Sequence, residues 1–401
     1  MRMRLTEKVF TCLPWLPAYV WQRWTRTATR GSVHLILCLA DHFEPSVLPK
    51  QGEARASADV QEQRLERWCR EIPKALKEWC DSDGFPFRHT YFYPAEQYDP
   101  GLIERLAQHC RDGWGEIEVH LHHGTQSPDT PENTRQVLLK FRDALACRGC
   151  LSQWDGQGEP RYAFVHGNFA LANSGRNQNC GVDAEMKILA DTGCYADFTL
   201  PSAPNPSQVA KINALYECSL PLERRSPHRQ GKDLRLGVAP ALFPLIIQGP
   251  LMWDLSRRKY GLPYPAIENG ELTASHPATA ERLSMWHRAA ITVVGRPDWV
   301  FIKLHCHGMD PRDEAAIFGE PMKRFLRGIV EGAKSTGEYQ VHFTTAREMT
   351  NIILAACDGR EGNPGNFRNY RLTPFRSRRL LRPSGVAPQV HHEKALNTCA
   401  E

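Results

Sequence analysis

The chain lacks a hydrophobic run long enough to cross a membrane. Its most apolar N-terminal stretch, residues 9–21, is shorter than a bilayer span and is interrupted by two prolines. No small-residue cleavage site follows it, so we expect neither a signal peptide nor a transmembrane segment. Trp15, Trp21 and Trp24, together with nearby arginines, leave two interpretations open: contact with an anionic membrane surface, or the more common burial against the end of the fold.

A strong charge bias and a disulfide framework are also missing. The formal net charge is only +5 over 401 residues, and the basic residues are mostly scattered, so nothing indicates a nucleic-acid partner. The 13 cysteines are odd in number and spread over the whole length. This usage is typical of a reducing compartment, and we expect a cytoplasmic protein.

Composition divides the chain into three parts. A hydrophobic content of 41% supports a large core. We expect an N-terminal extension over residues 1–30, a main domain over 31–357, and a basic, partly disordered tail over 358–401. Residues 203–298, rich in proline and charge, are expected to be a long insertion in the main domain.

The main domain alternates between strand-like and helix-like patterns. Apolar runs of strand length end at or near residues 40, 93, 119, 165, 200, 304 and 343. Amphipathic helical patterns cover residues 57–79, 101–111, 134–146, 183–192 and 320–334. This alternation is typical of a parallel α/β fold, and about seven strands favour a barrel over an open sheet.

The most informative segment is residues 116–124, which places three histidines after a short apolar run. Neutral imidazole is the commonest protein ligand for zinc and related divalent ions. In strand geometry His120 and His122 point to one face and His123 to the other, unless a turn at Gly124 brings His123 back. The sequence therefore predicts a metal site that includes His120.

Two further strands end in residues competent for metal binding or proton transfer. The run over 33–40 is followed by Asp41, His42 and Glu44, and the run over 299–304 by His305 and His307. The carboxyl ends of parallel strands meet on one side of a sheet. We therefore expect these side chains to share one site with the histidines of residues 120–123.

These three strand ends resemble motifs of the polysaccharide deacetylase (NodB-homology) superfamily, also called carbohydrate esterase family four. Leu39-Ala40-Asp41-His42 is similar to its first motif, Glu116-Ile117-Glu118-Val119-His120 to its second, and Ile302-Lys303-Leu304-His305 to its last. Residues 161–168 fall where the family has its third motif. The resemblance spans roughly residues 31–350 and implies a distorted (β/α) barrel of about seven parallel strands.

The resemblance also implies a chemistry, the removal of an N-acetyl group from an amino sugar or glycan precursor, and a set of roles. Asp41 would be the general base, tuned by Arg161, and His305, or its neighbour His307, would protonate the leaving amine. A divalent metal, expected to be zinc, would be held by His42, His120 and one of His122 and His123. Substrate contacts are expected from Glu44, His166, Asn168 and His307.

The sequence departs from the family pattern at two positions. His42 stands where the family has a second, metal-binding aspartate, which either His42 or Glu44 would replace, and Gly124 stands where it has a second histidine. Two other functions therefore remain open: a metal-dependent amidase acting on a non-sugar acyl amide, and a non-catalytic glycan-binding or assembly protein. The oligomeric state is left open as well.

Overall fold

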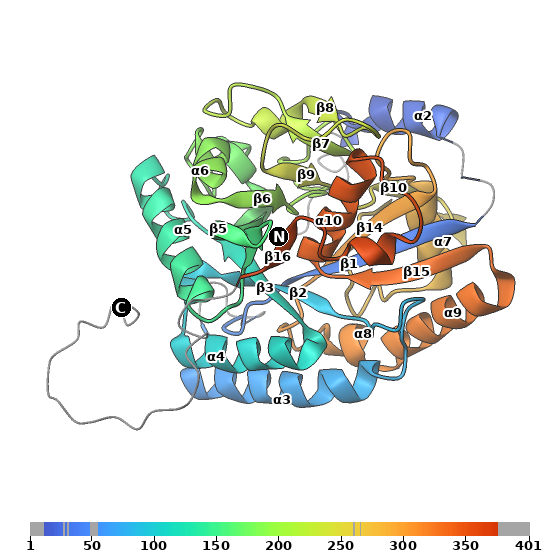
Figure 1. Cartoon of the computed structure of the whole chain (residues 1–401), viewed down its shortest axis with the longest axis horizontal. Coiled ribbons are helices and arrows are strands. Elements are labelled where there is room, and N and C mark those ends of the chain that lie inside the picture. Colours follow the sequence, from blue (N-terminus) through green and yellow to red (C-terminus); the bar gives the residue numbers. More distant parts are fainter. Residues whose placement is uncertain are drawn as a thin grey trace, which may run out of the picture.

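The computed structural model describes residues 12–375, apart from 27–28, 30–31, 49–54, 260 and 265. The arginine-rich end of the expected tail lies outside these residues. Within them, a twelve-stranded sheet forms the centre of the molecule, with helices packed around it (Figure 1). The expected α/β fold is confirmed at this level.

All seven strands expected from the sequence are present in the sheet. Their bounds are β1 (Val33–His42), β2 (His89–Pro94), β3 (Gly115–Leu121), β5 (Gln157–His166), β6 (Cys194–Asp197), β14 (Trp299–Cys306) and β15 (Tyr339–Thr344). They pair in parallel in the order β14-β1-β2-β3-β5-β6, and β15 lies beside the first half of β1. The order continues through β9 to β7 and β8 and does not return to β14, so the structure shows a large, mostly parallel sheet.

Residues 203–298 contribute to this sheet. The strands β7 (Leu215–Cys218), β8 (Gly231–Asp233) and β9 (Leu245–Ile247) extend it, and β7 runs antiparallel to both of the others. The same stretch holds helix α7 (Ala280–Arg288) and two small hairpins, β10 (Met252–Asp254) with β13 (Ala266–Glu268) and β11 (Arg258–Lys259) with β12 (Leu262–Pro263). Two short strands, β4 (Ser152–Trp154) and β16 (Leu372–Pro374), pair next to β5.

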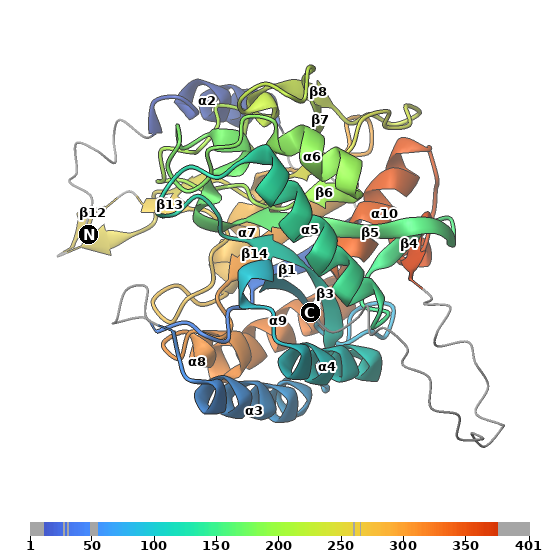
Figure 2. The same ribbon diagram turned by 90° about the vertical axis from the view of Figure 1, so that its left-hand side faces the viewer.

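The five helices expected from amphipathic patterns are also present. They are α3 (Ala58–Leu76), α4 (Pro100–His109), α5 (Pro131–Ala146), α6 (Glu185–Thr192) and α9 (Glu320–Thr336). Side-chain oxygens of Ser57, Asp99 and Thr130 cap the first turns of α3, α4 and α5. In Figures 1 and 2, α3 and α4 lie side by side below the sheet, and α5 and α6 lie together.

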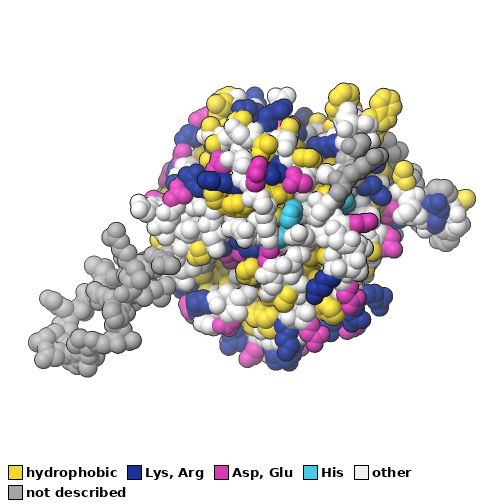
Figure 3. All heavy atoms as spheres, turned by 45° about the vertical axis from the view of Figure 1, so that its right-hand side comes forward, with side chains coloured by type: hydrophobic (Ala, Val, Ile, Leu, Met, Phe, Trp, Pro, Cys, Tyr) yellow, Lys and Arg dark blue, Asp and Glu magenta, His cyan; other side chains and the backbone are white. Residues whose placement is uncertain are grey.

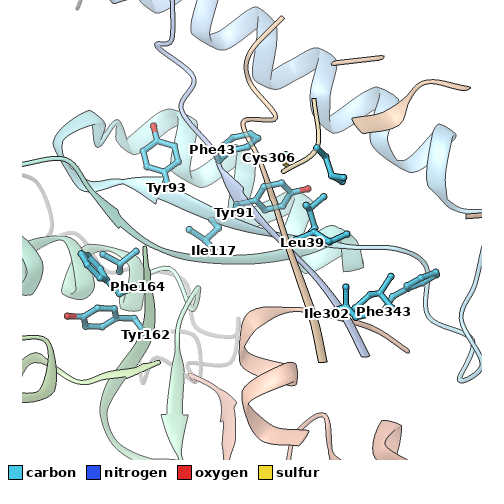
Figure 4. Packing of buried hydrophobic residues seen from close by; sticks show 14 of the residues in the cluster. Leu39, Phe43, Tyr91, Tyr93, Ile117, Tyr162, Phe164, Ile302, Cys306 and Phe343 are labelled. Carbon is cyan, nitrogen blue, oxygen red and sulfur yellow. The ribbon is translucent and has the colours of Figure 1, made fainter. Parts of the chain in front are cut away.

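Alternation along the strands separates two hydrophobic layers. In β1, Leu35, Leu37 and Leu39 join the layer that packs against α3, α4, α5, α6 and α9. Ile36 and Ala40 join a second layer together with helix α10 (Ala346–Cys357). Figure 4 shows part of the first layer. Because successive side chains of a strand point to opposite faces, parity along the strand decides to which layer each residue belongs.

Two short helices, α2 (Leu16–Thr25) and α8 (Glu314–Phe318), were not expected from the sequence. The N-terminal tryptophans take two different positions at α2. Trp15 is buried and stacks on Trp253, with ring centroids 5.6 Å apart. Trp21 and Trp24 are exposed, so contact with a membrane surface stays a prediction.

None of the described helices is long and apolar enough to cross a membrane. Charges of both signs mix over the face in Figure 3, where histidine side chains reach the surface near the centre.

Candidate metal centre

Three parallel strands deliver histidines to the same side of the sheet. His42 ends β1, His120 is the penultimate residue of β3, and His305 lies one residue before the end of β14. The His42 ring centroid lies 5.0 Å from that of His120, 4.9 Å from that of His307 and 6.0 Å from that of His305. The shared site expected from these strand ends is therefore formed by these four side chains.

Glu44 lies at the centre of this group. Its carboxylate belongs to two sets whose ligand atoms all lie within 4.8 Å of one another, one with His42 and His307 and the other with His120 and His122. Its side chain is only 16% exposed. The sequence left Glu44 open as a substrate contact or as a metal ligand in place of the family's aspartate, and the geometry favours metal binding.

The environment of His120 leaves one ring nitrogen free. Its Nδ1 atom lies 2.8 Å from the backbone oxygen of Val165, so the Nδ1–H group donates to that carbonyl. The Nε2 atom is buried, has no hydrogen-bond partner among the described residues, and lies 3.5 Å from Glu44 Oε1. This arrangement is the usual one for a metal-binding histidine, whose second nitrogen is held by a backbone or carboxylate acceptor.

His122 shows the same arrangement with a carboxylate acceptor. Its Nδ1 atom lies 2.8 Å from Glu96 Oε1, and its Nε2 atom lies 3.7 Å from Glu44 Oε1. The ring packs against Gly167, where a Cβ atom would come within 2.3 Å of His122 Cδ2. Only glycine at position 167 lets the imidazole lie here.

The spacing of these atoms fits a divalent ion. Two atoms bound to one tetrahedral zinc ion at about 2.0–2.1 Å lie roughly 3.4 Å from each other. Glu44 Oε1 lies 3.5 Å from His120 Nε2 and 3.7 Å from His122 Nε2. Together with the unpartnered His120 nitrogen, this makes Glu44, His120 and His122 the set that best fits a metal ion.

The protonation states suit metal binding. Burial opposes ionisation of Glu44, but His120 and His122 lower the pKa of its carboxyl to about 2. Burial, followed by neighbouring histidines, lowers the pKa of both His42 and His120. Burial also opposes protonation of His122, but Glu96 raises the pKa of its ring overall. A bound ion therefore competes with protons more strongly at His122 than at His42 or His120.

A cavity of about 720 Å³ opens above these residues. One wall comes from residues 270–272, which pair with the end of β14 through the backbone of His305. Glu44 and His122 line this cavity, whereas His120 is fully buried next to them. The cavity is lined by His42, Glu44, Val47, His122, Asn168, Phe169, Glu271, Thr273, Ala274, Ser275, His276, His307, Asp310, Arg312 and Asp313.

Asp41 does not face this cavity, which corrects its expected place as the general base. It precedes His42 in β1 and therefore points to the other face of the sheet. There it is fully buried, with Oδ2 3.0 Å from His89 Nδ1, and Oδ1 accepts a hydrogen bond from the backbone N–H of Gly308 at 2.7 Å. No described contact brings it to the histidines of the centre.

His123 and His166 also lie on the opposite side, away from Glu44. His123 Nε2 lies 2.9 Å from Glu185 Oε1 and 3.0 Å from His166 Nε2. His166 shares the parity of Phe164, which belongs to the helix-covered layer. The turn at Gly124 does not bring His123 back, so His122 is the histidine of this pair that belongs to the candidate metal centre.

Arg161, His305 and Asn168 take three further positions. Arg161 lies five residues before the end of β5, beside Gly193 at the start of β6, which separates it from the site by roughly 16 Å of extended strand. His305 is buried, and within the part of the chain that the structure describes its Nδ1 atom has no hydrogen-bond partner. Asn168 is exposed on the cavity wall, as expected of a substrate contact.

Several site residues were not found from the sequence. Glu96 lies two residues after the end of β2, so its position near a strand end was an available signal. Glu271 and Asp310 come from irregular segments, and no local pattern points to them. Three other aromatic side chains lie away from this cavity, with Tyr98 and Trp253 lining other cavities and Trp114 packed against the core.

Comparison with known proteins adds little to this geometry. No family model matches the chain. A stretch of 119 residues is 31% identical to zinc finger protein 142 of Mus musculus, which amounts to 28% of this chain and 6% of the mouse protein. So small a share of that protein shows no common family.

Proposed function

We propose that this protein is a metal-dependent hydrolase that removes an N-acetyl group from an amino sugar or glycan precursor. The observation that carries the proposal is the convergence of Glu44, His120 and His122 around one point beside a cavity that Glu44 and His122 line. The resemblance of the three strand ends to polysaccharide deacetylases supports it. With that resemblance we also propose that the sheet corresponds to a distorted barrel, that the ion is zinc, and that the protein acts in the cytoplasm.

Glu44, His120 and His122 would hold the ion. When bound, it supplies a Lewis acid for the acyl oxygen and lowers the pKa of water. Glu96 and the Val165 carbonyl fix the tautomers of the two histidines through their Nδ1 atoms. Both histidines are therefore oriented for metal binding by hydrogen bonds that do not require the ion.

His307 is the residue that we assign to proton transfer. It lines the cavity, is half-buried, and lies within 4.8 Å of Glu44 and His42. In the reaction it accepts a proton as water attacks the acyl carbon, and donates a proton to the nitrogen as the C–N bond breaks. Its position on the cavity wall favours it over His305, which is fully buried.

The cavity wall favours a polar substrate with hydroxyl groups. Asn168, Thr273, Ser275 and Arg312 offer hydrogen-bond donors, and Phe169 adds an apolar surface on which a sugar ring can pack. Sugar sites combine these two kinds of contact. A small acylated amino sugar fits this chemistry better than a purely apolar amide.

Acetate release from N-acetylated chito-oligosaccharides tests the proposal, with an acetyl-lysine peptide as the non-sugar arm. We expect the zinc-loaded full chain to release acetate from the sugar. His307→Ala should lower kcat by about 100-fold or more while zinc content stays unchanged. His287→Ala, half-buried on α7 and away from the cavity, is the matched control.

Three results would contradict parts of the proposal. Release from the peptide alone would assign the site to non-sugar amides. If the zinc-loaded chain released acetate from neither substrate, the proposed hydrolase activity would be wrong. A normal rate in His307→Ala would move proton transfer to another group.

A further inference from the structure

A second histidine cluster lies on the other side of the ends of β3 and β5. It consists of His123, His166, Cys180 and Glu185, all buried, with one ligand atom of each within 4.8 Å of the others. The residues come from four separate segments: the turn after β3, the end of β5, a loop, and the first turn of α6. None of them lines the cavity above Glu44.

The hydrogen bonds of the two rings place nitrogen lone pairs opposite each other. His123 Nδ1 lies 2.8 Å from Asp129 Oδ2, and His166 Nδ1 contacts the backbone oxygen of Gly167, so both Nδ1–H groups donate to acceptors. In neutral rings the two Nε2 atoms then carry lone pairs. They lie only 3.0 Å apart, and Glu185 Oε1 lies 2.9 Å from one and 3.5 Å from the other.

Three acceptor atoms that face each other repel unless a cation lies between them. An additional proton on one ring forms a hydrogen bond between only two of these atoms, whereas a metal ion binds all three. The fourth group, Cys180 Sγ, lies 3.7 Å from Glu185 Oε2 and completes the set.

We propose that His123, His166, Cys180 and Glu185 form a second, closed metal site that binds zinc and stabilises the fold. Two imidazoles, a thiolate and a carboxylate are ligands that zinc accepts in tetrahedral geometry. Binding releases the thiol proton of Cys180 to solvent. Four protein ligands leave no open position for substrate, which distinguishes this site from the one at Glu44.

The surroundings of the second site hold its ligands in place. Asp129, the acceptor for His123, also accepts a hydrogen bond from Thr134 Oγ1 at 2.8 Å. Glu185 Oε2 accepts the backbone N–H of Ala172 at 2.6 Å. Such outer contacts orient metal ligands and are expected around a true site.

Gly124 makes the approach of Cys180 feasible. Its φ is +63°, and a Cβ atom at this position would lie 2.0 Å from the backbone oxygen of Cys180. A side chain here would push away the loop that carries the thiol. The position at which the deacetylase pattern has a histidine is therefore the position that admits Cys180.

Counting and identifying bound metal tests the proposal with the full chain and zinc or cobalt as the probes. We expect two zinc ions per wild-type chain and one in His120→Ala, and X-ray absorption should show sulfur bound to the zinc in both. Cobalt-loaded protein should show a thiolate charge-transfer band. Cys180→Ala should lose this band and one zinc ion.

Cys194→Ala is the matched control, because Cys194 is an equally buried cysteine outside the cluster, and it should keep both the band and the second ion. Wild-type zinc without sulfur ligands would overturn the proposal, even if Cys180→Ala failed to fold. So would an unchanged cobalt band in Cys180→Ala. Loss of activity with the sulfur-bound zinc intact would count against the hydrolase function and leave the second site standing.

Discussion

Two histidine clusters lie back to back at the ends of β3 and β5, and consecutive residues divide between them. His122 faces Glu44 below an open cavity, whereas His123 faces Glu185 in a closed core. Both clusters combine imidazoles with a carboxylate. They differ in access, because Glu44 and His122 line a cavity, whereas every side chain of the second cluster is buried. Access from the solvent, more than the type of ligand, therefore distinguishes a site suited to catalysis from a site suited to stabilising the fold.

Removing the carboxylate of the closed cluster should have the largest effect on the fold. In Glu185→Gln the buried imidazoles lose their charged partner, which typically costs about 3–5 kcal/mol of unfolding free energy. Chemical denaturation measures this loss. Asp191→Asn, at an exposed carboxylate on the same helix, should cost less than about 1 kcal/mol. Equal losses in the two variants would contradict the assigned role of the closed cluster.

Removing a nitrogen ligand from the open cluster should affect activity more than stability. His120→Ala is expected to lower acetate release by more than about 100-fold, because even the outer contacts of metal ligands are worth 10–100-fold. One zinc ion should be lost, and the sulfur-bound ion should remain. Full activity in this variant would show that the chemistry lies elsewhere.

A smaller change at the open cluster should weaken metal binding without abolishing it. Glu96→Gln removes the charged acceptor of His122 Nδ1 and should lower zinc affinity about 10-fold, as measured by competition with a chelator. Glu104→Gln changes an exposed carboxylate outside the site and should leave the affinity unchanged. An effect of equal size in both variants would indicate a general electrostatic cause.

Acid should reduce the contribution of Glu185 gradually. Burial raises its pKa, but His166 and His123 lower the pKa overall to about 2 from an ordinary value of 4.5. Since the folded pKa lies below the unfolded one, the stabilisation is complete above about pH 4.5 and disappears as the pH falls through about 2. The difference in unfolding free energy between wild type and Glu185→Gln should shrink over this range. A difference that stays constant down to pH 2 would contradict a charged Glu185.

Hydrophobic periodicity predicted the elements that have one buried face or are short, apolar strands. The strands β1, β3 and β14 and the helices α3 and α9 lie within a few residues of their expected bounds. Helix α10 was missed because every one of its residues is buried, which removes the polar face that marks an amphipathic helix. Strand β7 was missed because four residues carry too little pattern.

Strand parity accounts for most of the site residues that were misplaced. Asp41 and His166 fall in register with the layer that packs against the helices, whereas His42, His120 and His305 fall in register with the opposite face. The alternation is present in the sequence, but a run that is apolar at every position, as in β1, does not show which face is which.

The sequence by itself determined that metal-competent residues follow several parallel strands and that His120 and His122 share a face, because these properties depend on local geometry alone. Only the tertiary structure decided that Glu44 joins these two histidines and that His123 joins Cys180 and Glu185. Those contacts depend on how distant segments pack, including the close approach of Gly124 to Cys180. No local pattern encodes that packing.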